Sequence, residues 1–418
     1  MNTVRKSERG QAIIFLVLGL VVFMGFVGLA IDGGMAMADQ REAQNLSDSA
    51  ALSAAGLASL ELENRHVYYS QWNCNSNDVQ EAIEVGLTSA IARAASNGFE
   101  IDDDITDHNG VTAVCGYDND NGYTDRWIDF TVEISDTTTT SFIQALYPSV
   151  VNINTDAVTR IRPRMPLAFG NAIVALNPDN CQGHQNGAIF YGTADSYITG
   201  GGVWTNGCLR TNGTPYVEVT GGAINYVGEL DGGNGLHPSP TKADNPIPPS
   251  SYEVAAPDCS DPDAHNVTSN WLINHSPLSP GLYCVTGDLQ FNGHDEVVGN
   301  GVTLYLRNGG IRINGNCNIQ LSAPAYSPDP SPAIPGIVIY MDPSNHSELK
   351  INGTSDSYWI GTILAPGANI DINGTGYIDS YRTQIIGWNV QVGGTADLWV
   401  TFEESNLYTK PTSMELYK

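Results

Sequence analysis

Basic residues are scarce in this chain of 418 residues. Lysine and arginine together number 18, against 45 aspartate and glutamate residues, and the formal net charge at pH 7 is −27. A surface with this charge repels the phosphate backbone of DNA and RNA, so we expect no nucleic-acid partner. The length is sufficient for two or three domains with a sizeable hydrophobic core.

Several chemical signatures are absent from the sequence. It contains no HExxH, GxSxG or P-loop pattern, and none of its cysteines is arranged as CxxC. The 8 histidines follow no metal-ligand spacing. We therefore predict a protein that is not an enzyme, with no catalytic and no cofactor-binding residues. The alternative is an enzyme acting on surface polysaccharide, which needs a carboxylate cluster that the spacing does not single out.

One long apolar run lies near the N-terminus. Residues 12–31 carry no charge, and their number matches the ~20 residues of a helix that crosses a bilayer. Arg5, Lys6 and Arg9 precede the run, and positively charged flanks stay in the cytoplasm. We expect a membrane anchor with the bulk of the chain extracellular or periplasmic. The alternative is a cleaved signal peptide, for which residues 36–38 (Ala-Met-Ala) offer a cleavage site.

The chain divides into three regions. Residues 1–60 comprise a cytoplasmic head, the transmembrane helix and a helical stalk rich in good helix formers. Residues 61–165 have the pattern of a small, pilin-like α+β module, in which apolar residues recur at helical spacing over 78–95 before several β-type runs. Pro163 and Pro166 mark the boundary between this module and the region that starts at residue 166.

Residues 166–418 carry an internal repeat. Asn-Gly or Gly-Gly turns follow short apolar runs with successive steps of 22, 38, 21 and 20 residues, at Asn292, Asn314, Asn352, Asn373 and Gly393. A period near 21 predicts a stacked β-solenoid, because Asn and Gly tolerate the left-handed backbone that the corners need. An antiparallel sandwich is the alternative, since Asn-Gly is also a hairpin signal.

Two stretches interrupt the repeat, and its ends need covering. The one long step contains a proline-rich stretch, which predicts a lateral loop at 323–336. A second stretch, rich in proline and aspartate, predicts a lateral loop at 231–280. Residues 397–408 are a candidate cap for the solenoid, because uncapped ends expose unpaired strands.

Seven cysteines are spread along the chain, and an exported protein keeps disulfides. Their order favours pairs between neighbours, which leaves Cys317 over; buried free thiols are the alternative. The expected pairs are Cys74–Cys115, Cys181–Cys208 and Cys259–Cys284.

An acidic loop is the single candidate for a metal ion. Asp118, Asp120 and Asp125 accompany two asparagines and Gly122, which resembles part of a calcium loop: oxygen ligands at alternate positions with a glycine for the turn. The closing glutamate of such loops is missing. Calcium binding and a solvated loop both remain open.

The N-terminal residues resemble a known family. Glu8-Arg9-Gly10-Gln11-Ala12-Ile13-Ile14-Phe15, the apolar run, and the segments 28–34 and 48–55 look like the N-terminal region of TadG-like proteins, which are envelope proteins associated with tight-adherence (Tad/Flp) pili. Related pilins carry a glutamate at the fifth position after the glycine, where this chain has Phe15. The resemblance therefore implies a retained anchor and partners among pilus or envelope proteins.

The repeat region carries a second resemblance. Residues 278–284, 301–306, 321–324 and 361–368 look like the right-handed parallel β-helix of some TadG-like and PilX-like surface proteins. The expected fold is thus mainly β: a transmembrane and stalk helix, a small α+β module and a right-handed parallel β-helix. The expected function is that of a non-catalytic, membrane-anchored surface protein associated with a Tad/Flp-type pilus or similar appendage, in adhesion or assembly. A self-assembling filament subunit with a helical core is the alternative.

Overall fold

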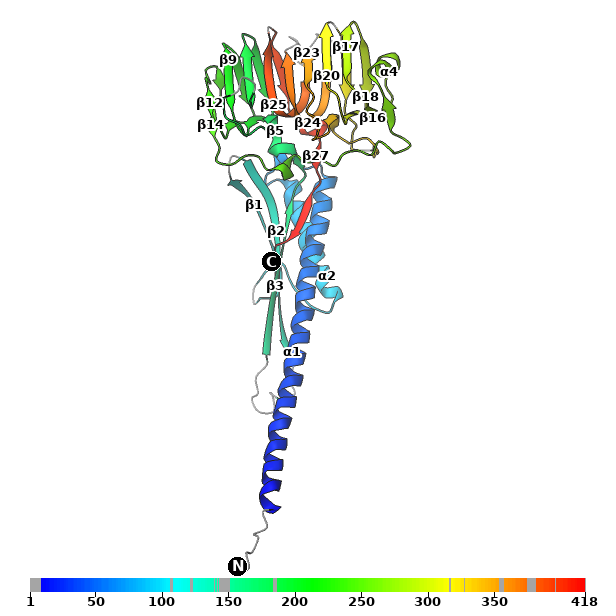
Figure 1. Ribbon diagram of the computed structural model, residues 1–418. Helices are drawn as coiled ribbons and strands as arrows, with labels where there is room; N and C mark the ends of the chain where they lie inside the picture. Colours follow the sequence, from blue (N-terminus) through cyan, green and yellow to red (C-terminus); the bar gives the residue numbers. More distant parts are fainter. Residues whose placement is uncertain are drawn as a thin grey trace, which may run out of the picture.

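A computed structural model shows a long stalk that carries a transverse β-solenoid (Figure 1). The structure describes residues 9–105, 108–120, 123–138, 140, 142, 151–182, 186–315, 317–326, 328–352, 357–373, 381–394 and 396–417. The stalk consists of helix α1 and the α+β module beside its upper half. The solenoid lies across the top of the stalk, so that the molecule has the outline of a T (Figure 1).

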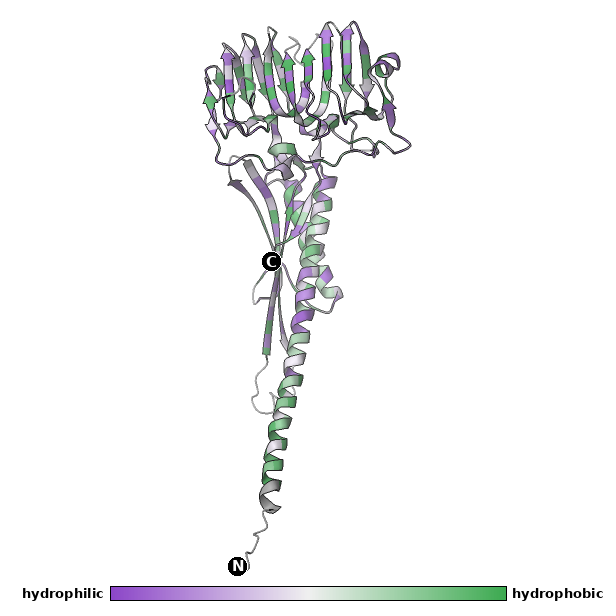
Figure 2. Ribbon diagram, viewed as in Figure 1, coloured by the Kyte–Doolittle hydropathy of each residue, from purple (hydrophilic) through white to green (hydrophobic). Residues whose placement is uncertain are grey.

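Helix α1 (Arg9–Asn64) is continuous over 56 residues and changes character along its length. The large apolar side chains of its first half, from Ile13 to Ile31, are exposed, and Figure 2 shows this part as mostly hydrophobic. In its second half, small side chains recur every three or four residues on one face and are completely buried, among them Ala43, Ala50, Ala54 and Ala58. These alanines allow the module to pack closely against the helix backbone.

The α+β module packs one helix and one antiparallel sheet on this alanine face. Helix α2 (Asn77–Ser96) begins at Ser76, whose Oγ accepts a hydrogen bond from the backbone of Val79. The sheet has the order β1 (Gly110–Asp120), β2 (Tyr123–Thr138), β3 (Val151–Arg162) and β28 (Ser413–Leu416). Its inner face buries Val111, Ile128, Phe130, Val132 and Ile161 against the two helices.

The C-terminal strand β28 lies outside the solenoid, although residues up to 418 were predicted to belong to it. Ser413–Leu416 return to the stalk and pair antiparallel with β3. The sequence-based boundary therefore differs from the structure at this end. A four-residue strand whose two apolar residues, Met414 and Leu416, alternate with polar ones has the same short pattern as the strands of the solenoid, so the sequence does not separate it from a solenoid turn.

The described strands of the solenoid form one sheet of 22 strands, wound into stacked turns. Strand pairs between successive turns are parallel, which excludes the antiparallel sandwich. The elements are β5 (Asn171–Ala175), β6 (Ala188–Gly192), β7 (Asp195–Thr199), β8 (Gly202–Thr205), β9 (Leu209–Gly213), β10 (Tyr216–Thr220), β11 (Ile224–Tyr226), β12 (Leu230–Asp231), β13 (Leu236–His237), β14 (Thr241–Lys242), β15 (His265–Val267), α4 (Ser269–Asn274), β16 (Gly281–Val285), β17 (Leu289–Gly293), β18 (Glu296–Asn300), β19 (Val302–Leu306), β20 (Ile311–Gly315), β21 (Asn318–Ser322), β22 (Ile337–Met341), β23 (Leu349–Asn352), β24 (Tyr358–Asn373), β25 (Tyr381–Gly394) and β26 (Leu398–Thr401).

The turns do not stack in the order of the sequence. The chain enters at β5 in the middle of the solenoid and winds outward to β14. It then crosses to the opposite end at β15 and winds back to the middle, where β25 pairs with β24 on one side and with β5 and β6 on the other. Figure 1 shows this as red strands between green and orange ones. We call the contact of β25 and β26 with β5, β6 and β7 the seam.

The buried ladders inside the solenoid are continuous across the seam. One such ladder contains, in spatial order, Leu289, Ile311, Leu349, Ile370, Val390, Ala188 and Leu209, all of which are at most 1% exposed. Lys350 and Asp371, 21 residues apart, occupy equal positions in adjacent turns. The sequence period of about 21 residues thus corresponds to one full turn of the solenoid.

The solenoid face toward the stalk is buried on both sides. Its strands are mostly apolar, such as β19, in which Thr303 is the one polar residue, and β22, and every residue of these two strands is buried. Inward side chains join the solenoid core, while outward ones, including Trp204, Tyr305 and Tyr340, are covered by residues 243–264, which we call the crossing segment. The predicted lateral loop at 231–280 is confined to this segment; the residues on either side form turns of the solenoid.

Both ends of the solenoid are blunted. One end finishes in β13 and β14, of two residues each, and the other in the three-residue β15 with helix α4. Trp271 of α4 stacks on His275 at a ring-centroid distance of 4.0 Å. The predicted cap, residues 397–408, instead supplies the interior strand β26 and the exit toward the stalk. Short edge strands disfavour pairing of one solenoid with another.

Candidate functional site at the junction of stalk and solenoid

The chain passes twice between stalk and solenoid, and the two passages lie side by side. The upward passage contains β4 (Met165–Pro166), and the returning one contains β27 (Thr409–Lys410), which pairs antiparallel with β4. Both lie beside the upper end of α1. The junction is therefore built from three segments that are far apart in the sequence.

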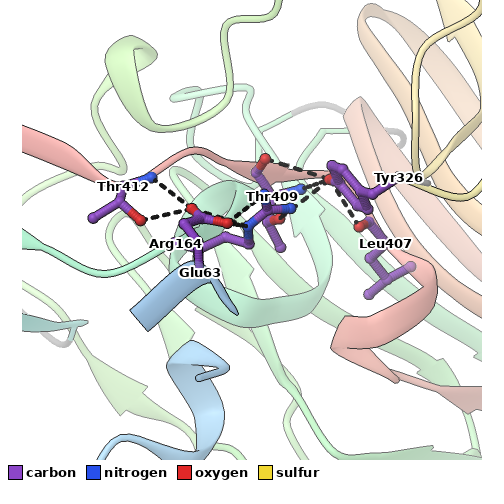
Figure 3. A network of polar contacts seen from close by, with 6 residues as sticks. All are labelled: Glu63, Arg164, Tyr326, Leu407, Thr409 and Thr412. Carbon is purple, nitrogen blue, oxygen red and sulfur yellow. Dashed lines mark hydrogen bonds and ion pairs between the residues drawn. The ribbon is translucent and has the colours of Figure 1, made fainter. Parts of the chain in front are cut away.

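A carboxylate at the end of α1 binds both passages (Figure 3). Glu63 accepts hydrogen bonds from Nε and Nη2 of Arg164 at 3.0 and 2.7 Å, and from Oγ1 of Thr412 at 2.6 Å. Burial alone raises the pKa of Glu63, but the hydrogen bonds from Arg164 and Thr412 and the charge of Arg164 outweigh burial, so that the pKa lies below its ordinary value. The carboxylate thus fastens the stalk helix to both passages.

Tyr326 adds the inserted loop 323–336 to the same network. Its hydroxyl accepts a hydrogen bond from the backbone of Thr409 at 2.6 Å and lies 3.3 Å from the carbonyl oxygen of Leu407. The guanidinium of Arg164 stacks over the Tyr326 ring at 4.4 Å from its centroid (Figure 3). A cavity of about 260 Å³ lies beside this network, lined by Glu63, Arg164 and Tyr326 among others.

A second buried carboxylate fastens the other side of the junction. Glu404, in the exit from the solenoid, is 6% exposed and accepts hydrogen bonds from the backbone of Tyr69 and Ser70 at 2.8 and 2.9 Å. The guanidinium of Arg126 lies over the Tyr69 ring, 3.9 Å from its centroid. Two carboxylates, one from each side, therefore hold the junction together.

Sequence reasoning did not identify the junction residues. Glu63, Arg164, Tyr326, Glu404 and Thr412 belong to no motif, and the partners of Glu63 are 101 and 349 residues away in the chain. Pro163 and Pro166 are the one feature of the sequence that indicates where the junction lies, because they mark the end of the module.

The three disulfides are the pairs expected from sequence order. Cys74–Cys115 ties the segment before α2 to β1, Cys181–Cys208 lies between β5 and β9, and Cys259–Cys284 fixes the crossing segment to β16. Cys317 is buried outside these three disulfides, with its thiol donating a hydrogen bond to the carbonyl oxygen of Asn314, and burial raises the pKa of that thiol. Disulfides are typical of chains that fold in an oxidising compartment.

The candidate calcium residues lie at the upper tip of the β1–β2 hairpin. Asp118 and Asp125 occupy directly opposed positions. The Asp118 carboxylate accepts a hydrogen bond from Nε1 of Trp127, and that of Asp125 from Nε of Arg162. Asp120 ends β1, and residues 121–122 lie outside the described part of the chain. Within the described part, no group of three or more His, Cys, Asp or Glu is placed to hold a metal ion. Calcium binding stays a prediction.

Two of the residues that could serve a polysaccharide enzyme as acid or base, Asp371 and Arg312, form ion pairs on the solenoid. The sequence offers as such candidates Asp288, Asp295, Glu296, Asp356, Asp371, Asp379, Arg307, Arg312 and Arg382. Asp371 pairs with Lys350 at 2.6 Å and accepts a hydrogen bond from the Tyr191 hydroxyl at 2.9 Å. Arg312 pairs with Glu348 at 3.2 Å. The two ion pairs link adjacent turns, whereas the hydrogen bond from Tyr191 in β6 reaches past β25 to Asp371 in β24. Asp356 and Asp379 lie outside the described residues.

The apolar half of α1 is exposed as a membrane-spanning helix would be. Side chains such as Phe15, Phe23 and Leu29 are 63–73% exposed. The helix is by length and composition the one candidate span among the described residues. Just above this stretch, the buried carboxylate of Asp32 accepts a hydrogen bond from the backbone of Phe142 at 2.9 Å.

Comparison with known proteins gives one match. The family described as "Putative Flp pilus-assembly TadE/G-like" matches residues 10–57, which contain the exposed apolar stretch and most of the alanine face of α1. Neither the curated proteins nor the solved structures contain a match. The similarity is thus confined to α1, and the solenoid has no counterpart in these comparisons.

Proposed function

We propose that this protein is a membrane-anchored extracellular component associated with a Tad/Flp-type pilus, and that it presents its solenoid for adhesion or assembly. The observation that carries the proposal is the exposed apolar half of α1, which coincides with the TadE/G-like match. Apolar side chains exposed all round a helix need a lipid or helical partner.

The dimensions of α1 support an anchor that is also a stalk. At 1.5 Å per residue, its 56 residues are about 84 Å long, whereas the hydrocarbon core of a bilayer is about 30 Å thick. With residues 13–31 in the bilayer, the rest of α1 and the module hold the solenoid well away from the lipid. The three disulfides fit an extracellular or periplasmic body.

A non-catalytic role agrees with the chemistry of the described residues. The junction carboxylates are occupied by hydrogen bonds from both sides, and the acids on the solenoid surface bond to adjacent turns. A carboxylate that takes part in acid–base catalysis has to face a substrate. These groups instead connect neighbouring segments of the protein through hydrogen bonds and ion pairs.

The alternative of a self-assembling filament subunit makes a different use of α1. The blunted solenoid ends disfavour end-to-end stacking, so a filament would have to be built from the helices. The exposed apolar half of α1 is the surface that would form such a core. The two functions therefore differ in what surrounds residues 13–31.

Mass spectrometry of the intact N-terminus separates these outcomes. The protein would be recovered from the membrane fraction and from filaments sheared off the cells. We expect a chain that retains residues 12–31 in the membrane fraction and copurifies there with pilus proteins. Abundant chain in otherwise pure filaments would establish the filament subunit. A chain that starts after residue 38 in every fraction would contradict the anchor.

A further inference from the structure

A second cavity at the junction gathers basic side chains in an otherwise acidic protein. It has a volume of about 400 Å³ and lies between the module, the crossing segment and the returning passage. Three cationic side chains line it: Arg126 from β2, Arg162 from the end of β3, and Lys410 from β27. The whole chain has only 18 lysines and arginines, so three around one cavity are a local concentration of positive charge.

Two of these cations lack a carboxylate that neutralises them directly. The Nη1 atom of Arg126 is buried without a hydrogen-bond acceptor among the described residues. The nearby Glu404 attracts Arg126 electrostatically, but its oxygens accept bonds from the backbone of Tyr69 and Ser70. Burial lowers the pKa of Arg126 by more than the attraction of Tyr69 and Glu404 raises it. The Tyr69 ring below the guanidinium and the charge of Glu404 offset only part of the cost of burying Arg126, and an anion bound to Nη1 would offset more.

Lys410 faces the same cavity under similar conditions. Its ammonium group donates a hydrogen bond to the carbonyl oxygen of Ser250, and burial lowers its pKa although Glu253 lies close enough to attract it. Arg162 differs, because Asp125 and Glu415 both pair with it. The lining thus holds three cations against two carboxylates, Asp125 and Glu253, with one of these already bound to Arg162.

We propose that this cavity binds a small molecule through an oxyanion, a carboxylate or phosphate group, held by Arg126 and Lys410. The volume falls within the range of small-molecule sites, about 300–1,000 Å³. Apolar side chains such as Val254 and Met165 line the remainder and suit the less polar part of the ligand. The ligand would touch the module, the crossing segment and the returning passage at once, and so would stiffen the junction.

Isothermal titration calorimetry on the full chain in detergent tests the site with three probes: inorganic phosphate, glucuronate and glucose. We expect heat from phosphate or glucuronate and none from glucose, and the stronger of the two identifies the kind of oxyanion. Arg126→Gln and Lys410→Gln should each weaken binding roughly tenfold, the effect of one lost charged hydrogen bond.

Arg312→Gln is the matched control, because it removes an equal charge from an exposed ion pair on the solenoid. It should leave the dissociation constant within about twofold. Thermal melts would show whether Arg126→Gln folds; Lys410→Gln, on the partly exposed β27, provides an independent reading if it does not. No heat from either anion, equal binding of glucose, or equal losses in Arg312→Gln and Lys410→Gln would each overturn the proposal.

Discussion

The lower half of α1 and the solenoid contain similar apolar residues but satisfy them in opposite ways. In the solenoid, side chains such as Ile370 and Val390 are buried by strands of this same chain. Along residues 13–31, Phe23 and Leu29 are 68% and 63% exposed. The solenoid is thus complete by itself, whereas the lower helix is one partner of an interface whose other side is lipid or a neighbouring helix.

The two regions also differ in how local their stability is. A helix satisfies its backbone within each turn, so the lower half of α1 needs no distant segment. The solenoid closes only when β25 meets β5 and β6, strands more distant in sequence than any pair within one turn. Charged substitutions in the lower half of α1 should therefore change where the protein is located in the cell. Substitutions at the seam should instead lower the stability of the solenoid.

The largest effect is expected from charges in the lower half of α1. The double variant Leu20→Arg/Phe23→Arg places two guanidinium groups near the centre of the apolar stretch, at about 3 kcal/mol each on insertion scales. Most of the protein should then be released from membranes by alkaline carbonate extraction. Met37→Arg is the control, since Met37 is 65% exposed but lies beyond the stretch. Full retention of the double variant would show that lipid is not the partner.

A smaller effect is expected at the seam. Asn389 in β25 accepts hydrogen bonds from the side chain of Asn177 and the backbone of Gly187, and donates one to Asn369. Asn389→Ala leaves these buried groups unpaired, which should lower the free energy of unfolding by about 2–3 kcal/mol. Urea unfolding followed by tryptophan fluorescence measures it.

Asn314→Ala is the matched control for the seam, because Asn314 bonds Asn292 in an exposed ladder between ordinary turns. Its cost should stay within about 0.5 kcal/mol. If the two variants unfold at the same urea concentration, contacts at the seam contribute no more to the stability of the protein than contacts between other turns.

The smallest effect is expected at the junction, and it should depend on pH. The pKa of Glu63 is lowered in the folded protein, so its contribution is complete above the ordinary glutamate pKa of about 4.3 and is lost as the pH falls through the lower folded value. At pH 7, Glu63→Gln should cost about 1 kcal/mol, the net worth of such a hydrogen-bonded pair.

The difference between wild type and Glu63→Gln should close as the pH falls below about 4.3. Urea midpoints measured across this range provide the readout. Glu348→Gln, in the exposed pair with Arg312, should differ little from wild type at any pH. A constant difference for Glu63→Gln would mean that its charge does not fasten the junction.

The contrast between local and distant contacts also explains which parts of the fold could be predicted. The apolar run, the α+β pattern and the turns after Phe291, Ile313 and Ile372 are read within short windows, and they identify a helix, a module and a solenoid. The stacking order is different, because the same period of about 21 residues results whether the chain enters at an end or in the middle. The seam thus left no trace in the repeat.

The junction was hidden for a related reason. Glu63, Arg164 and Thr412 are single polar residues in three distant segments, and nothing in their spacing relates them. Arg126 is a single arginine in the alternating strand β2, and this pattern predicts a solvent-exposed side chain. Only the path of the chain brings these side chains together, and that path depends on where the solenoid is entered.

The position of the seam has a consequence for the order of synthesis. A chain made from its N-terminus completes β5 to β14 before β25 and β26 exist, because these two strands follow β5, β6 and β7 by some 200 residues. Until then the open edge of β5, β6 and β7 is free to pair with another nascent chain. If α1 anchors the protein as proposed, the membrane tethers each growing molecule at its own site, and unfinished solenoids stay apart from one another until the last strands close them.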